Sequence, residues 1–132
     1  MTELLPNQPD RRLRILVVDA DERVRESLAG LLGIGQRCVV VGSAGHPAAA
    51  LALVAADPPD IVMLDPRLPD VAEGRAFIAQ VRLIAPTVRV ILMGTVDPAG
   101  SDDLAGAHAV IRKTFRPREL QDAISAVAAL PG

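Results

Sequence analysis

Polar side chains that could do chemistry stand at the ends of four short apolar runs in this sequence. Asp19 ends the first run and Asp65 the third. Gly94 and Thr95 follow the fourth, and Lys113 ends a weaker fifth. An aspartate after a strand is usually a helix cap or a turn residue, so each residue alone is a weak signal. Together, two carboxylates, a hydroxyl and an ammonium group form a set suited to holding a polar ligand.

The apolar runs that carry these residues are the expected strands of a parallel sheet. They cover 14–19, 38–42, 60–65, 88–93 and, more weakly, 109–113. Polar and apolar residues do not alternate within them, which indicates that helices cover both faces of the sheet. Ligands bind at the carboxyl ends of the strands in such a sheet, so we expect the polar groups to meet there.

Helical spacing of apolar residues fills most of the gaps between the expected strands. Three groups would each share one helix face: Val24, Leu28, Leu31 and Leu32; Phe77, Ile78, Val81 and Ile84; Leu120, Ile124 and Val127. Pro47 and Pro117 stand where a first helical turn tolerates proline. The segment 96–108 offers at most a turn or two. We therefore predict an α/β fold, a doubly wound (βα)5 sheet of five parallel strands with a short fourth helix.

Composition and charge narrow the class of protein. A chain of 132 residues is about one domain, and its net charge of −2 with scattered basic residues argues against direct nucleic-acid binding. The longest apolar run is about half a membrane span, so we expect a cytoplasmic protein without a membrane segment. Cys38, the only cysteine, stands among valines and should act as a small buried hydrophobe. Residues 1–12 are predicted to form a loose arm before a domain at 13–130.

Two longer motifs make the sequence recognisable. PDIVMLDPRLPD, followed later by AGAHAVIRKTF, resembles the receiver domain of two-component response regulators, and the resemblance covers about Leu13 to Ala129. Within that family, the match is closest to NarL/FixJ-type receivers. The resemblance implies a CheY-like, flavodoxin-like fold and a signalling role rather than an enzyme. Asp65 matches the phosphoacceptor that takes a phosphoryl group from a histidine kinase, and Lys113 matches the lysine that pairs with that group.

The same resemblance implies a Mg²⁺ site, which this sequence leaves incomplete. Asp19 matches the first member of an acidic pair, and the metal would also contact Asp65 and the backbone carbonyl of Arg67. Ala20 stands where the second, directly coordinating carboxylate belongs, so Mg²⁺ binding should be weak. Asp21 could substitute, although its place just before a helix favours an N-cap. The guanidinium of Arg67 could instead balance the aspartates without metal.

The switch positions of the family also differ here. Gly94 falls where receivers of this kind have the Ser or Thr whose hydroxyl contacts the phosphoryl group, with Thr95 one place later. Val110 replaces the aromatic residue that follows this hydroxyl. Pro66, next to the phosphoacceptor position, has no N–H to donate.

Three functions remain open on the sequence. The first is an atypical receiver that signals through protein–protein contacts, and the second is a conventional receiver phosphorylated by a histidine kinase. The third is a small nucleotide-binding, flavodoxin-like protein, supported by GSAG at 42–45. His46 and His108 are expected to be exposed or capping residues rather than catalytic bases. A homodimer is possible, and a DNA-binding output domain would need residues past Gly132.

Overall fold

The computed structural model describes residues 12–65, 67, 70–94, 107–111 and 116–130. Within them, five strands form one parallel sheet in the order β2-β1-β3-β4-β5. The strands are β1 (Leu13–Val18), β2 (Cys38–Ala44), β3 (Ile61–Leu64), β4 (Arg89–Met93) and β5 (Ala109–Ile111). The chain order reverses between β1 and β3, which is the topological switch point of a doubly wound sheet. The predicted fold class is therefore confirmed.

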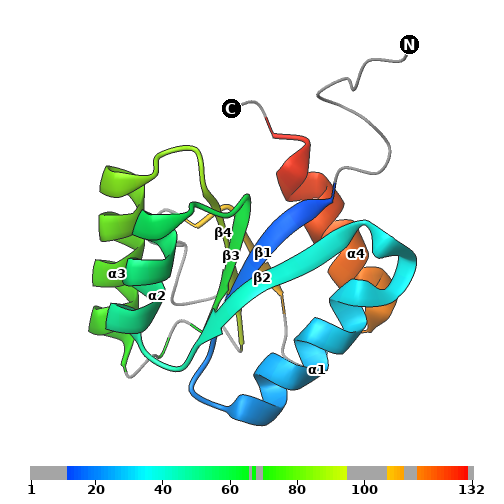
Figure 1. Ribbon diagram of the computed structural model, residues 1–132, viewed down its shortest axis with the longest axis horizontal. Helices are drawn as coiled ribbons and strands as arrows, with labels where there is room; N and C mark the ends of the chain where they lie inside the picture. Colours follow the sequence, from blue (N-terminus) through cyan, green and yellow to red (C-terminus); the bar gives the residue numbers. More distant parts are fainter. Residues whose placement is uncertain (1–11, 66, 68–69, 95–106, 112–115, 131–132) are drawn as a thin grey trace, which may run out of the picture.

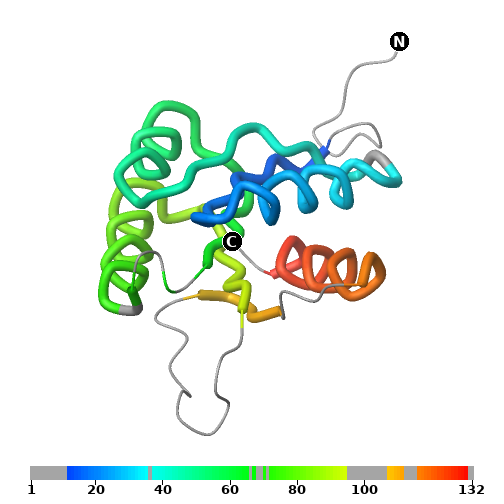
Figure 2. The backbone as a smooth tube through the Cα atoms, turned by 90° about the horizontal axis from the view of Figure 1, so that it is seen from below, coloured from blue at the N-terminus to red at the C-terminus, as the bar shows by residue number. Residues whose placement is uncertain are grey.

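Helices cover both faces of the sheet (Figure 1). α1 (Glu22–Gly33), which runs into a short 3-10 turn (Ile34–Gln36), lies on the same face as α4 (Pro117–Ala128). α2 (Pro47–Ala56) and α3 (Val71–Ile84) lie on the other face. The same two layers are visible in the rotated view of Figure 2. The predicted short fourth helix, at 96–108, and the predicted N-terminal arm fall almost entirely outside the described residues.

Alternate residues of β1, an interior strand of the sheet, pack into different halves of the core. Ile15 and Val17 of β1 belong to the cluster under α1 and α4, and Leu16 and Val18 belong to the cluster under α2 and α3. All four are at most 1% exposed. A fully buried side chain of this kind stabilises the fold by about 1.5–3 kcal/mol. Because β1 is covered on both faces, apolar residues at every position of the strand contribute to stability.

The helices begin where their capping residues predict. The Asp21 side chain accepts from the backbone N–H of Arg23, and His46 and Asp70 cap α2 and α3 in the same way. Pro47 and Pro117 occupy first helical turns, as predicted. No helix in the described part of the chain is both long and apolar enough to cross a membrane.

Two predicted side-chain environments were wrong. Ile84 is the last residue of α3 and is 48% exposed, whereas the other three residues of its predicted apolar face are buried. His108 is half-buried and caps no helix. Its backbone N–H donates to the carbonyl of Val90 (2.8 Å), and its Nδ1 accepts from the Val90 N–H (3.1 Å), so the imidazole extends the pairing of β5 with β4.

Candidate functional site

The sheet brings Asp19 and Asp65 to the same edge. Val18 of β1 pairs with Leu64 of β3, and each aspartate is the next residue in its chain. The Asp65 N–H donates to the carbonyl of Val18 at 2.9 Å, so the backbones of the two aspartates lie next to each other. Parallel pairing in this register places both carboxylates at the carboxyl end of the sheet, beside the switch point.

The carboxylate of each of these aspartates accepts a hydrogen bond from the backbone N–H two residues later in the chain. Asp19 is 1% exposed, and its Oδ1 accepts from the N–H of Asp21 at 2.8 Å. Asp65 is half-buried, and its Oδ1 accepts from the N–H of Arg67 at 3.0 Å. Asx turns of this kind fix the side-chain rotamer, so both carboxylates have defined orientations.

The two residues between Asp19 and α1 do not provide a second carboxylate next to Asp19, as a pair of adjacent acidic residues would. Ala20 is exposed and carries only a methyl group. Asp21 is exposed, and its Oδ1 accepts from the Arg23 N–H at 2.9 Å as the N-cap of α1. Its negative charge therefore lies at the positive end of the helix dipole. Among the residues with described positions, no three His, Cys, Asp or Glu side chains gather in a metal-binding arrangement.

Arg25 is a residue of this region that sequence reasoning missed. It lies on the first turn of α1, where its Nη1 donates to the backbone carbonyl of Asp19. The same nitrogen is 3.2 Å from the place that a Cβ on Gly45 would occupy. The Asp19 N–H in turn donates to the carbonyl of Ala44 at 3.0 Å. The guanidinium thus holds the end of β1 against the end of β2, and the missing side chain of Gly45 leaves room for it.

The GSAG segment is not the phosphate-binding loop that the third sequence hypothesis needs. Gly42, Ser43 and Ala44 belong to β2, and a Cβ on Gly42 would meet side-chain carbons of Leu16 and Leu53. At 3.4 and 3.6 Å these would be ordinary van der Waals contacts, so Gly42 lies against packed side chains. Because Arg25 occupies the space over Gly45, the structure offers no empty cradle in this segment.

Of the other predicted site residues, the structure describes some and not others. Gly94 follows β4, donates its N–H to the carbonyl of Ile111 at 2.9 Å, and has a φ of 145°. Val110 is half-buried in β5 and packs against the cluster under α2 and α3. Arg67 is exposed, and its backbone N–H donates to the Asp65 carboxylate at 3.0 Å. Thr95, Lys113 and Pro66 lie outside the described residues.

Cys38 has the environment predicted for it. Its side chain is 3% exposed at the start of β2, and burial raises the pKa of its thiol despite the nearby positive charge of Arg37. A thiol with a raised pKa stays protonated near neutral pH and is a poor nucleophile. Cys38 therefore acts as a small apolar side chain.

Comparison with known proteins places this arrangement in a family. The family model of the response regulator receiver domain matches residues 15–125. The DNA-binding transcriptional activator DevR/DosR of Mycobacterium tuberculosis is 37% identical over 120 residues, which are 89% of this chain and 55% of that protein. A protein-glutamate methylesterase/protein-glutamine glutaminase of Anaeromyxobacter dehalogenans is 32% identical over 97 residues, 74% of this chain and 26% of that protein. The chain thus spans about half or less of these curated relatives.

Solved structures agree with this match. The signal receiver domain of the response regulator NarL from Mycobacterium tuberculosis superimposes with a TM-score of 0.77 at 31% identity, covering 89% of this chain and 96% of that one. The response regulator domain of Thermotoga maritima CheB has a TM-score of 0.79 at 22% identity, covering 92% and 100%, and supports the fold alone. With five parallel strands, aspartates at the ends of β1 and β3, and a family match over most of its length, the chain belongs to the response regulator receiver domains of two-component signalling.

Proposed function

We propose that this chain is an atypical receiver, which signals through protein–protein contacts and in which Mg²⁺-dependent phosphorylation of Asp65 is weak or absent. The observation that carries the proposal is the use of the segment Asp19-Ala20-Asp21. Its middle residue has no carboxylate, and its last carboxylate caps α1. One negative charge that a divalent cation needs is therefore missing.

The residues present fit Mg²⁺ poorly. The ion prefers octahedral oxygen coordination and gives up its water reluctantly, so each carboxylate matters. Asp19 and Asp65 supply two carboxylates, and one oxygen of each already accepts a backbone hydrogen bond. A carboxylate about 4 Å from a divalent cation contributes several kcal/mol at an effective dielectric of about 20, before desolvation is subtracted. Losing one of these charges should therefore weaken Mg²⁺ binding by at least about tenfold.

Asp65 remains the residue that would accept a phosphoryl group. The Arg67 N–H at 3.0 Å orients its carboxylate at the end of β3, where it is partly open to solvent. The proposed partner of the phosphoryl group is Lys113, and the backbone carbonyl of Arg67 is the proposed third metal ligand. These assignments rest on the family resemblance, and the orientation of Asp65 is compatible with them.

The switch that follows phosphorylation would also be altered. Gly94 has no hydroxyl, and its backbone conformation is one that residues with a side chain rarely adopt. Val110 is half-buried and has no large ring to move. Thr95 is the remaining hydroxyl at this position of the sequence. Gly94 and Val110 thus support the proposal of a receiver whose signalling does not depend on the paired movement of a hydroxyl and an aromatic side chain.

The proposed partner is a histidine kinase or another signalling protein rather than nucleic acid. The matched part of the DNA-binding activator DevR/DosR is about half of that protein, and the net charge of this chain is −2. A DNA-binding function would therefore depend on other residues or another protein. We also propose that the chain forms a homodimer and that it is cytoplasmic. We propose an arm at 1–12 and a domain at 13–130.

Intact mass spectrometry after incubation with acetyl phosphate and Mg²⁺ tests the proposal. We expect no stoichiometric adduct on the wild-type chain and a clear adduct on Ala20→Asp, which restores the missing carboxylate. A stoichiometric wild-type adduct that disappears in Asp65→Asn would establish the second function, a conventional phosphoacceptor receiver. The Asp65→Asn variant is also the control for acetylation or phosphorylation at other residues.

A further inference from the structure

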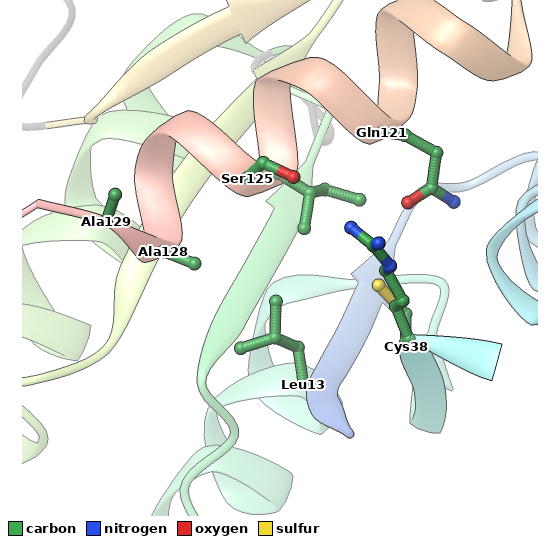
Figure 3. Close-up of a pocket in the computed structure, with 8 residues that line it drawn as sticks. Leu13, Cys38, Gln121, Ser125, Ala128 and Ala129 are labelled. Carbon is green, nitrogen blue, oxygen red and sulfur yellow. The ribbon is translucent and has the colours of Figure 1, made fainter. Parts of the chain in front are cut away.

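A cavity of about 580 Å³ lies at the opposite end of the sheet from Asp19 and Asp65. It opens where β1 and β2 begin, under the C-terminal half of α4 (Figure 3). Its walls are formed by Leu13, Arg37, Cys38, Gln121, Ile124, Ser125, Ala128 and Ala129. This volume is within the range of about 300–1,000 Å³ that small-molecule sites occupy.

Part of the lining of the cavity is apolar. Ile124 and Cys38 are nearly fully buried, and Leu13 is half-buried beside them. Ala128 and Ala129 expose only methyl groups along the end of α4, which leaves the cavity open at that point. Because burial keeps the Cys38 thiol protonated, this wall offers packing surface rather than a nucleophile.

The remaining lining residues carry hydrogen-bond donors. Gln121 extends from α4 toward Cys38 on β2, and Ser125 lies on the same helix (Figure 3). Arg37 adds a guanidinium, whose charge is close enough to act on the Cys38 thiol. Among the lining residues that the structure describes, none carries a carboxylate. The fixed charge of the cavity is therefore positive, and its neutral polar groups can all donate hydrogen bonds.

We propose that this cavity binds a small amphipathic anion, a carboxylate with a short apolar chain. The carboxylate would lie at Arg37, with Gln121 and Ser125 as further donors. The apolar chain would lie along Leu13, Cys38 and Ile124. A cation of the same shape would meet the guanidinium, and a fully polar anion would leave the apolar wall in contact with water. The proposal is independent of phosphorylation at Asp65.

Three eight-carbon probes with one shared chain separate these possibilities: octanoate, 1-octanol and octylammonium. Isothermal titration calorimetry of the wild-type protein should show octanoate binding most tightly and octylammonium least tightly. In Arg37→Gln, octanoate affinity should fall about fivefold, the size expected for a partly exposed ion pair, while octanol affinity stays unchanged. Ala128→Leu, which adds carbon atoms at the mouth of the cavity, should weaken octanoate and octanol alike.

Ala52→Leu on the exposed side of α2 is the matched control for the added side chain, and it should bind octanoate like the wild type. Equal affinity for octanoate and octylammonium would overturn the proposal, as would binding that Ala128→Leu leaves intact. If the wild-type protein is instead a dimer by analytical ultracentrifugation and Ala128→Arg makes it monomeric, the cavity is a subunit interface and the proposal is wrong.

Discussion

The carboxylate of Asp19 accepts a hydrogen bond of 2.8 Å from the backbone N–H of Asp21, so it reaches across Ala20. The methyl group of Ala20 is exposed, and a carboxylate placed there would displace no core contact. We predict that Ala20→Asp binds Mg²⁺ at least about tenfold more tightly than the wild type, because the added charge acts at short range. Calorimetric titration with MgCl₂ measures this difference.

The isosteric variant Ala20→Asn separates the charge from the size of the new side chain. It should bind Mg²⁺ much more weakly than Ala20→Asp. Equal affinities of the two variants would show that the missing charge is not what limits metal binding in this pocket.

Arg25 should stabilise the end of β1 through its bond to the carbonyl of Asp19. We predict that Arg25→Met lowers the free energy of unfolding by about 1 kcal/mol, which is less than the roughly 1.5–3 kcal/mol of a hydrogen bond with a charged group because Arg25 is only half-buried. Urea denaturation measures the change. Gly45→Ala should cost less, because a Cβ at 3.2 Å meets only the movable end of the Arg25 side chain. A larger loss for Gly45→Ala than for Arg25→Met would contradict this account.

Gly94 should resist substitution because of its backbone conformation. With a φ of 145°, an alanine or threonine there is strained, and we predict a loss of about 1–2 kcal/mol in unfolding free energy. Gly94→Thr would therefore not simply restore the family hydroxyl. Gly30→Ala is the matched control: an added Cβ in α1 meets nothing within 4 Å, and the helix should gain about 0.5–1 kcal/mol. Equal effects of the two Gly→Ala changes would rule out the strain.

His108 should make stability fall in mild acid. Burial lowers its pKa below the ordinary 6.5, and the positive charges of Arg89 and Arg82 act in the same direction. The neutral imidazole accepts from the Val90 N–H, whereas the imidazolium cannot. The unfolded chain therefore binds the proton more readily. The stabilising contribution is complete above 6.5 and is lost as the pH falls through 6.5 toward the folded pKa.

Urea denaturation at neutral pH and in mild acid tests this dependence. His108→Asn keeps an acceptor that does not titrate in this range, so its stability should fall less between the two conditions than that of the wild type. Gly30→Ala in α1 leaves both histidines in place and should retain the wild-type dependence. An unchanged pH dependence in His108→Asn would assign the effect to other groups.

The architecture could be predicted because its causes are local in the sequence. Apolar runs without alternation require a sheet covered on both faces, and Asp21 before an amphipathic segment predicts an N-cap; the structure confirms both. The position of Asp65 at a strand end also follows from one such run. Its proposed role as phosphoacceptor comes from the family resemblance, because no local pattern distinguishes it from a turn residue.

Tertiary structure alone decided which distant groups meet. Arg25 reaches the end of β1 and the space over Gly45, and His108 pairs with a residue 18 positions earlier in the chain. Arg37 and Gln121 line one cavity although they lie far apart in the sequence. Periodicity reports which face of an element is apolar, and carries no information on which far segment packs against it. The surroundings of Asp19 and Asp65 and the cavity under α4 are therefore consequences of packing. The absence of a carboxylate at Ala20, in contrast, follows from the sequence alone.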